Sequence, residues 1–211
     1  KNLMKTLKDN SDLIFIGAII LVIILVIFLK PVIFPGGAGN TTTTGLTGTG
    51  GEGSTVGSEY GVVNLEFYVM SQCPYGTQVE DGIAPVLKSL GGAVNFSLYF
   101  IGRLEGTKFN SLHGEPEVQG DMVQACAAKY NPDKYMDMIV CMNKDAKSIP
   151  GNWKTCAEDN GLDVNSINTC YTGEEGIELL KASFAAATAK QATGSPTIYL
   201  DGVQYSGGRD A

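Results

Sequence analysis

One cysteine in the sequence lies where a thiol is expected to be reactive. Cys73 stands in the stretch MSQCPYG, between a run of strand-forming residues and the start of an expected helix. The free backbone N–H groups and the dipole at a helix N-terminus stabilise a thiolate, which is the nucleophile in disulfide exchange. Cys73 is therefore the candidate nucleophile. The competing interpretation is a free buried cysteine that only fills space.

Gly76 follows three residues after Cys73, where a redox dithiol of the Cys-x-x-Cys type would have its second cysteine. With glycine there, the predicted site has one nucleophile and no adjacent thiol to resolve a mixed disulfide. No Lys, Arg or His lies within five residues of Cys73, so the helix end must supply most of the thiolate stabilisation.

The other four cysteines follow at similar spacings, at Cys126, Cys141, Cys156 and Cys170. Outside the cytosol such a set predicts two disulfides, in one of three pairings. Zinc is the alternative, but zinc sites favour Cys-x2–4-Cys pairs, which this spacing does not provide; four unpaired cysteines would suit a cytosolic protein better. We prefer the nested pairing. Cys141 and Cys156 would lie level on antiparallel helices around a turn at 145–151, which leaves Cys126 for Cys170.

The residues around Cys73 predict a parallel strand–helix–strand unit. Residues 62–70 are β-branched and aromatic, residues 77–90 carry apolar side chains at helical spacing, and residues 94–101 indicate a second strand. Such a unit is right-handed in nearly all cases. It places Cys73 in the turn between the first strand and the helix.

A helical region and a late hairpin are expected to follow. The predicted helices lie near 116–130, 132–145, 151–160, 163–171 and 174–192. Gly194-Ser195-Pro196 ends this region, and residues 197–200 and 203–206 are expected to pair around the turn residues Asp201-Gly202. A covering helix is expected to start near Arg209, so we expect the natural protein to continue past residue 211.

These features resemble the thioredoxin superfamily, and within it the branch of DsbA-like proteins and gamma-interferon-inducible lysosomal thiol reductases. The resemblance rests on Cys-Pro-Tyr at 73–75 and Ser-Pro-Thr at 195–197, together with Leu112-His113-Gly114-Glu115 and the cysteine series. It covers residues 62–208. It implies an α/β thioredoxin fold with a helical insertion at about 102–192.

The resemblance also implies roles for individual residues. Cys73 would be the nucleophile, and Pro196 would be the cis-proline beside it. The supporting residues would be Pro74, Tyr75, Gly76, Ser195 and Thr197. Because the family usually has its resolving cysteine where Gly76 lies, monothiol exchange or isomerisation is implied rather than oxidation by a built-in disulfide. No cofactor and no metal is expected. His113, the only histidine, could assist a thiol, but such a residue is more often part of a loop or a helix cap.

The chain ahead of this domain has a different composition. Residues 13–29 are uninterrupted apolar residues that span about 26 Å as a helix, and residues 31–34 extend them. We predict a transmembrane helix at 13–34 with residues 1–12 cytoplasmic, because three lysines precede it and one follows closely. A signal-peptide segment is the alternative. The Gly-, Thr- and Ser-rich residues 35–59 predict a flexible linker, which leaves residues 60–211 as one domain.

Charge and cysteine usage limit the partners. Residues 1–59 carry equal numbers of basic and acidic residues, so the net charge of −7 belongs to the domain and argues against nucleic acid. The expected partners are protein thiols and disulfides, with a small thiol or a membrane redox partner to release mixed disulfides. The sequence favours a membrane-anchored, extracytoplasmic exchange protein that acts through Cys73. The alternative is a thioredoxin-fold module that binds extended peptides or partner proteins.

Overall fold

The computed structural model describes residues 61–207. The predictions for residues 1–12, 13–34 and 35–59, and for a helix near Arg209, therefore lie outside the described residues. Within residues 61–207, no helix has both the length and the apolar character needed to span a membrane.

A four-stranded sheet in the order β2-β1-β5-β6 forms the centre of the domain. β1 (Val63–Val69) pairs in parallel with β2 (Val94–Phe100), which confirms the predicted strand–helix–strand unit. β5 (Thr197–Leu200) runs antiparallel to β1, and β6 (Val203–Gln204) runs antiparallel to β5. The predicted late hairpin is thus present, and β1 is a central strand of the sheet.

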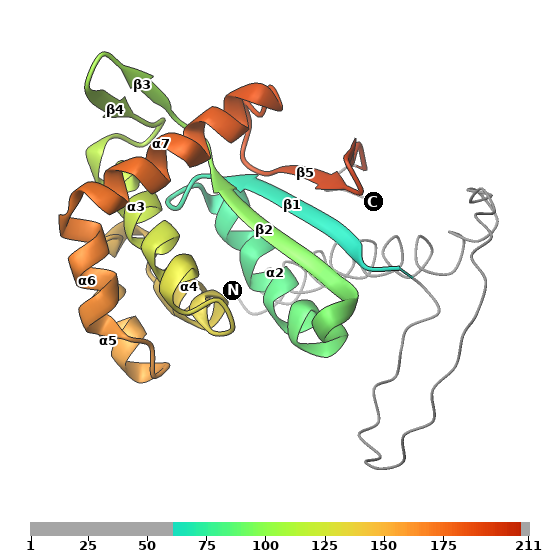
Figure 1. Cartoon of the computed structure of the whole chain (residues 1–211), viewed down its shortest axis with the longest axis horizontal. Helices are drawn as coiled ribbons and strands as arrows, with labels where there is room; N and C mark the ends of the chain where they lie inside the picture. The colour runs from blue at the N-terminus through green and yellow to red at the C-terminus, as the bar shows by residue number, and fades with distance from the viewer. Residues whose placement is uncertain (1–60, 208–211) are drawn as a thin grey trace, which may run out of the picture.

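Six helices of seven or more residues accompany this sheet within residues 61–207. They are α2 (Pro74–Leu90), α3 (Glu115–Tyr130), α4 (Tyr135–Asn143), α5 (Trp153–Asp159), α6 (Val164–Thr172) and α7 (Glu174–Ala189). Figure 1 shows α2 behind the sheet, α3 to α6 grouped beside it and α7 crossing above them. Each helix expected from the sequence is present. α2 begins at Pro74 rather than near residue 77, because proline fits the first helical position.

A short hairpin precedes the helical group and was not predicted. β3 (Arg103–Glu105) and β4 (Lys108–Asn110) form a separate two-stranded sheet. Gly106 in the turn has a φ of 63°, a conformation that glycine adopts without strain. Strands of three residues are too short to show a hydrophobic alternation, so the sequence pattern does not reveal them.

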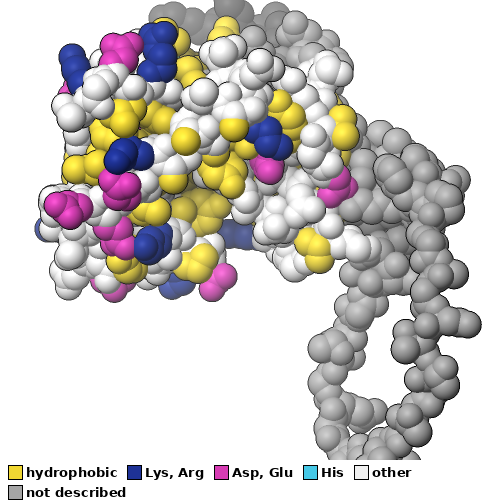
Figure 2. Space-filling view, turned by 45° about the horizontal axis from the view of Figure 1, so that its top comes forward, with side chains coloured by type: hydrophobic (Ala, Val, Ile, Leu, Met, Phe, Trp, Pro, Cys, Tyr) yellow, Lys and Arg dark blue, Asp and Glu magenta, His cyan; other side chains and the backbone are white. Residues whose placement is uncertain are grey.

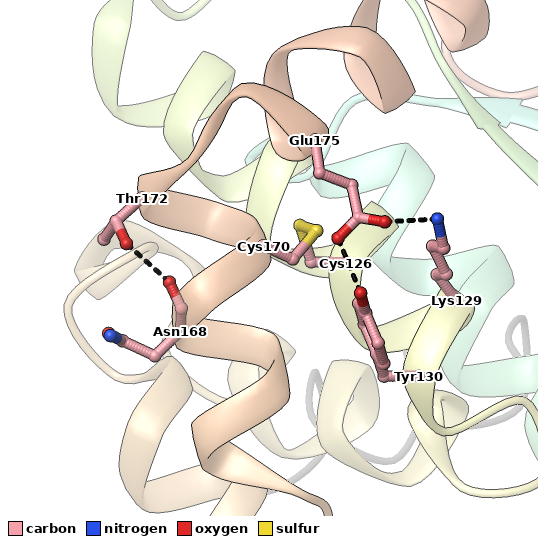
Figure 3. The surroundings of a disulfide bond; sticks show 7 residues. All are labelled: Cys126, Lys129, Tyr130, Asn168, Cys170, Thr172 and Glu175. Atoms are coloured by element: carbon pink, nitrogen blue, oxygen red, sulfur yellow. Dashed lines mark hydrogen bonds and ion pairs between the residues drawn. A yellow bond between two sulfur atoms is a disulfide. The ribbon is translucent and has the colours of Figure 1, made fainter.

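Two disulfides tie the helical group together. One bond joins Cys126 of α3 to Cys170 of α6, and Figure 3 shows its surroundings. The other joins Cys141 of α4 to Cys156 of α5. This is the nested pairing preferred from the sequence, because α4 and α5 lie on either side of the turn at 145–151.

Polar contacts and core packing support the same helices. Glu175 at the start of α7 accepts hydrogen bonds from Lys129 and from the Tyr130 hydroxyl at the end of α3 (Figure 3). Met138 and Met142 on α4 are fully buried in the core, where flexible methionine side chains fill irregular space.

Removing the disulfides one at a time is expected to destabilise the domain to different extents. The Cys126–Cys170 bond closes a longer chain segment than the Cys141–Cys156 bond, 44 against 15 residues. Loop-closure entropy predicts losses of about 4 and about 3 kcal/mol for the two double alanine variants. Denaturant unfolding of both variants measures this difference. A larger loss for the Cys141–Cys156 pair would contradict the entropic account.

Candidate active site

Cys73 occupies the turn between β1 and α2. It is the N-cap residue of α2, with extended backbone angles, and Pro74 takes the first helical position. The Cys73 N–H donates to the carbonyl of Met70 at 3.0 Å, and the Cys73 carbonyl accepts the N–H of Thr77 at 2.9 Å. The loop and the first helical turn thus hold Cys73 at the end of α2 where anions are stabilised.

The second predicted segment lies directly beside Cys73. Because β5 pairs with β1, with Thr197 opposite Tyr68, the residues ahead of β5 meet the loop that follows β1. The Ser195–Pro196 peptide bond is cis. The Cys73 thiol lies 3.7 Å from the carbonyl oxygen of Ser195, close enough to donate a weak hydrogen bond. Two segments that are 122 residues apart in sequence therefore form one site.

Cys73 is the one free cysteine among the five, all of which lie in the described residues 61–207, and it is largely buried. It is 7% exposed and packs in an apolar cluster with Tyr68, Met70, Ile101, Ala187 and Ala192. By contrast, the two residues that follow it, Pro74 and Tyr75, are exposed. Any partner of the sulfur would have to reach a largely buried atom.

Gly76 and Ser195 fit together so closely that a side chain at position 76 would have to displace the Ser195 hydroxyl. A Cβ atom at Gly76 would lie 2.5 Å from Ser195 Oγ and 3.0 Å from the Met70 carbonyl oxygen. The Ser195 hydroxyl is held in this place, since it accepts the Met70 N–H at 3.0 Å. The hydroxyl therefore fills the space beside Cys73 that a second cysteine would need.

A groove of about 770 Å³ adjoins the site. Four of its apolar residues, Met70, Ile101, Ala187 and Ala192, also pack around Cys73. Its other walls come from the β3–β4 hairpin and the end of α7. Figure 2 shows one face of the domain, with hydrophobic side chains at the surface between charged ones. A second cavity, of about 600 Å³, lies against β2 and α2 and contains none of the predicted site residues.

Three polar residues lie near the loop: Glu117, Asp121 and His113. The sequence analysis predicts no role for the two acids and leaves alternatives open for His113. Glu117 and Asp121 on α3 are fully buried and bind the backbone of the Cys73 loop. His113 lies just before α3, and its Nδ1 is 2.6 Å from Glu117 Oε2. The sequence gives only a weak indication of this contact: Glu117 and Asp121 are spaced to lie on the same helix face, and the other residues of that face are buried.

Comparisons with known proteins agree with this geometry. The sequence model of the family described as gamma interferon inducible lysosomal thiol reductase (GILT) matches residues 64–160. BdbD from Bacillus subtilis superposes with a TM-score of 0.55 at 15% identity, covering 69% of this chain and 79% of BdbD. A comparison with curated protein sequences finds no match.

Two proteins from Mycobacterium tuberculosis give similar values. Its DsbA has a TM-score of 0.54 at 18% identity, covering 73% of this chain and 80% of DsbA. Its disulfide bond oxidoreductase DsbG has a TM-score of 0.54 at 17% identity, covering 74% of this chain and 76% of DsbG. The domain therefore has a thioredoxin-like fold and is similar to DsbA-like proteins and, over residues 64–160, to the GILT family. The α/β thioredoxin fold with an insertion of helices, expected from the sequence, is confirmed.

The buried acid Glu80 predicts that the stability of the domain depends on pH. Within this thioredoxin-fold domain, burial raises the pKa of Glu80 on α2 to about 8, while Asn143 donates to its carboxyl at 3.0 Å. The folded protein keeps this proton up to about pH 8, whereas the unfolded chain loses it near the ordinary value of 4.5. Stability from this group is therefore lost as pH rises from about 4.5 to about 8.

Replacing Glu80 with Gln should flatten this dependence. The amide keeps an acceptor for Asn143 and does not titrate, so the decline between about pH 5 and 8 should become shallower by up to about 1.4 kcal/mol per pH unit. Urea unfolding at several pH values measures the slope. An unchanged slope in Glu80→Gln would show that Glu80 is not protonated in the folded domain.

Proposed function

We propose that this protein is a thiol–disulfide exchange protein that acts through the single nucleophile Cys73. The observation that carries the proposal is the position of the free Cys73 thiol, at the N-terminus of α2 and 3.7 Å from the Ser195 carbonyl. The similarity to DsbA, DsbG and the GILT family supports the same chemistry. The substrates would be protein disulfides and thiols.

The reaction needs one attacking sulfur and balances without a cofactor. The Cys73 thiolate attacks one sulfur of a substrate disulfide, a Cys73–substrate disulfide forms, and the other substrate sulfur leaves as a thiolate that takes a proton from water. A thiolate from the substrate or from a small thiol then attacks the mixed disulfide. This second step returns Cys73 to its thiolate form.

The first attack requires the substrate to come close to a nearly buried sulfur. An extended substrate segment could lie along the groove next to Cys73, where Met70, Ile101, Ala187 and Ala192 offer an apolar wall. The cis-proline loop would form the other side of the binding site. Direct contact with Cys73 would then displace the weak hydrogen bond to the Ser195 carbonyl.

The release step must use an external thiol. The four other cysteines are bonded to each other in the helical group, and Gly76 supplies no sulfur. Net oxidation of a substrate by an internal disulfide does not fit this site. Isomerisation and monothiol exchange with a small thiol both fit it.

Two features support the proposed location of the protein: its two disulfides, and the composition of residues 1–59. Two structural disulfides suit an oxidising compartment outside the cytosol. The apolar residues 13–34, proposed as a transmembrane helix with residues 1–12 in the cytoplasm, would hold the domain at the outer face through the linker of residues 35–59. A membrane redox partner could then supply the resolving thiol.

A second function is favoured by the burial of Cys73. At 7% exposure, the cysteine could be a small apolar side chain in a module that binds extended peptides without covalent chemistry. The two functions differ in one observable, the formation of a covalent bond between Cys73 and a substrate.

Covalent trapping separates the two functions. The protein with Cys73 reduced, incubated with insulin and quenched with acid, should give a mixed disulfide that dithiothreitol dissolves, as seen by mass spectrometry. Cys73→Ser should give no adduct, because the other cysteines are already paired. Equal non-covalent binding of insulin by both forms, with no adduct, would favour the binding module instead.

Adding a second cysteine should require a change at Ser195 as well. Gly76→Cys alone is expected to cost about 1–3 kcal/mol, because its Cβ must displace the Ser195 hydroxyl from its bond to Met70. When Gly76→Cys is combined with Ser195→Ala, oxidised glutathione should join Cys73 to the introduced cysteine in a disulfide, with the loss of two hydrogens by mass. Ser195→Ala alone is the control for the lost hydrogen bond. A Gly76→Cys protein as stable as the wild type would show that Ser195 does not limit this position.

A further inference from the structure

The backbone N–H groups of residues 70–73 are all bound, one by Ser195, two by side chains of α3 and one within the loop itself. Met70 donates to Ser195 Oγ at 3.0 Å, and Cys73 donates to the Met70 carbonyl at 3.0 Å. Between them, Ser71 donates to Asp121 Oδ1 at 3.0 Å and Gln72 donates to Glu117 Oε2 at 3.2 Å. The two residues that immediately precede the nucleophile are therefore held by carboxyl groups of α3.

One face of α3 is built for this contact. Glu117, Gly120, Asp121 and Gln124 recur at helical spacing, and the three side chains among them are fully buried. A Cβ atom at Gly120 would lie 2.5 Å from Ser71 Oγ and 2.4 Å from Ile149 Cγ2. The absence of a side chain there lets α3 approach the loop closely enough for its carboxyl groups to reach the backbone.

Glu117 is the centre of the contact. Its carboxyl group accepts hydrogen bonds from the backbone N–H of Gln72 and of His113, at 3.2 and 3.1 Å. The Ser111 hydroxyl donates to it at 2.5 Å, and His113 Nδ1 lies 2.6 Å away. Its backbone carbonyl accepts from Ser71 Oγ at 3.2 Å. Several partners thus fix the orientation of the carboxyl group that binds Gln72.

Asp121 holds the loop in a different way. Its Oδ1 accepts from Ser71, while its Oδ2 is buried without a partner among the described residues. Burial raises the pKa of Asp121 well above its usual range, and the nearby Glu117 and Glu80 carboxyl groups raise it further. An asparagine at this position would keep an oxygen that can accept the Ser71 N–H.

We propose that Glu117 and Asp121 are positioning residues for the chemistry of Cys73. By fixing the peptide groups of Ser71 and Gln72, they set the direction in which the Cys73 sulfur points towards the cis-proline loop. This inference rests on the proposed exchange function for its chemical meaning. Its structural part, the fixing of the two peptide groups by α3, can be tested without any reaction.

Positioning makes a specific prediction about two reactions of the same sulfur. A protein disulfide must approach Cys73 in one orientation, whereas iodoacetamide is small and has little orientational requirement. Misplacing a reacting group by about 1 Å can cost on the order of 100-fold in rate. Loss of positioning should therefore slow the attack on insulin disulfides without slowing alkylation by iodoacetamide.

The variants Glu117→Ala and Asp121→Ala test this. Each should lower the ratio of the insulin rate to the iodoacetamide rate by about 10- to 100-fold. Asp121→Asn keeps the acceptor for Ser71 and should retain the ratio within about threefold. Val123→Ala is the matched control, because it removes buried volume from the same helix and belongs to the core rather than to the loop contact. It should lower the melting temperature and leave the ratio unchanged.

Two results would overturn the proposal. The first is an unchanged rate ratio in folded Glu117→Ala and Asp121→Ala. The second is an Asp121→Asn variant as impaired as Asp121→Ala, because its acceptor would then not be what matters. A wild-type Cys73 that does not react with insulin at all would contradict the proposed function instead.

Amide hydrogen exchange decides the structural part even if the alanine variants do not fold. In the wild-type protein, the amides of Ser71 and Gln72 should be protected well beyond those of the exposed β3–β4 hairpin. In Asp121→Asn the Ser71 amide should remain protected. Exchange of both wild-type amides at the rate of the exposed hairpin would show that α3 does not hold the loop.

Discussion

The close approach of α3 to the Cys73 loop is the constraint on which the geometry of the candidate site depends. It requires the missing side chain at Gly120, and it brings two carboxyl groups to backbone N–H groups that no strand or helix satisfies. Unpaired buried N–H groups would cost free energy comparable to lost hydrogen bonds. The helical insertion is therefore a wall of the site rather than an addition to it. Cys126 follows on the same helix, so the disulfide to Cys170 also restrains the element that carries Glu117 and Asp121.

A second close contact, between Gly76 and Ser195, bears on the chemistry proposed for the site. Ser195 Oγ occupies the space above Gly76 and binds the Met70 N–H, so the cis-proline loop and the start of α2 meet without room for a second sulfur. Glycine at position 76 and serine at position 195 are thus complementary in size. This complementarity agrees with the proposed monothiol mechanism, because a cysteine at position 76 would require Ser195 to move.

The local pattern of the sequence was sufficient to predict the elements that carry the predicted site. Local sequence alone indicates each of these elements. They are the strand at residues 62–70, the glycine–serine–proline break before residue 197 and the Asp201-Gly202 turn. In the turn, Asp201 and Gly202 both have the positive φ that this pair of residues predicts. The preferred cysteine pairing could be deduced in the same way, since it depended only on distances from one turn.

The remaining features depend on contacts between distant segments. Glu117 and Asp121 lie 45 and 50 residues from the peptide groups that they bind. The sequence around each acid therefore does not indicate which backbone group it binds. Likewise, Ala187 and Ala192 near the end of α7 contribute to the burial of Cys73, although nothing near residue 73 indicates them. Tertiary packing, rather than periodicity, determines these features.

The release step tests the monothiol mechanism most directly. Cys73 can be loaded with the chromogenic disulfide of nitrothiobenzoate, and the release of the coloured thiol can be followed at increasing glutathione concentrations. The account predicts a rate proportional to the glutathione concentration, with no release when glutathione is absent. Rapid release without glutathione, with both disulfides of the helical group intact at the start, would mean that an internal sulfur resolves the bond and would contradict it.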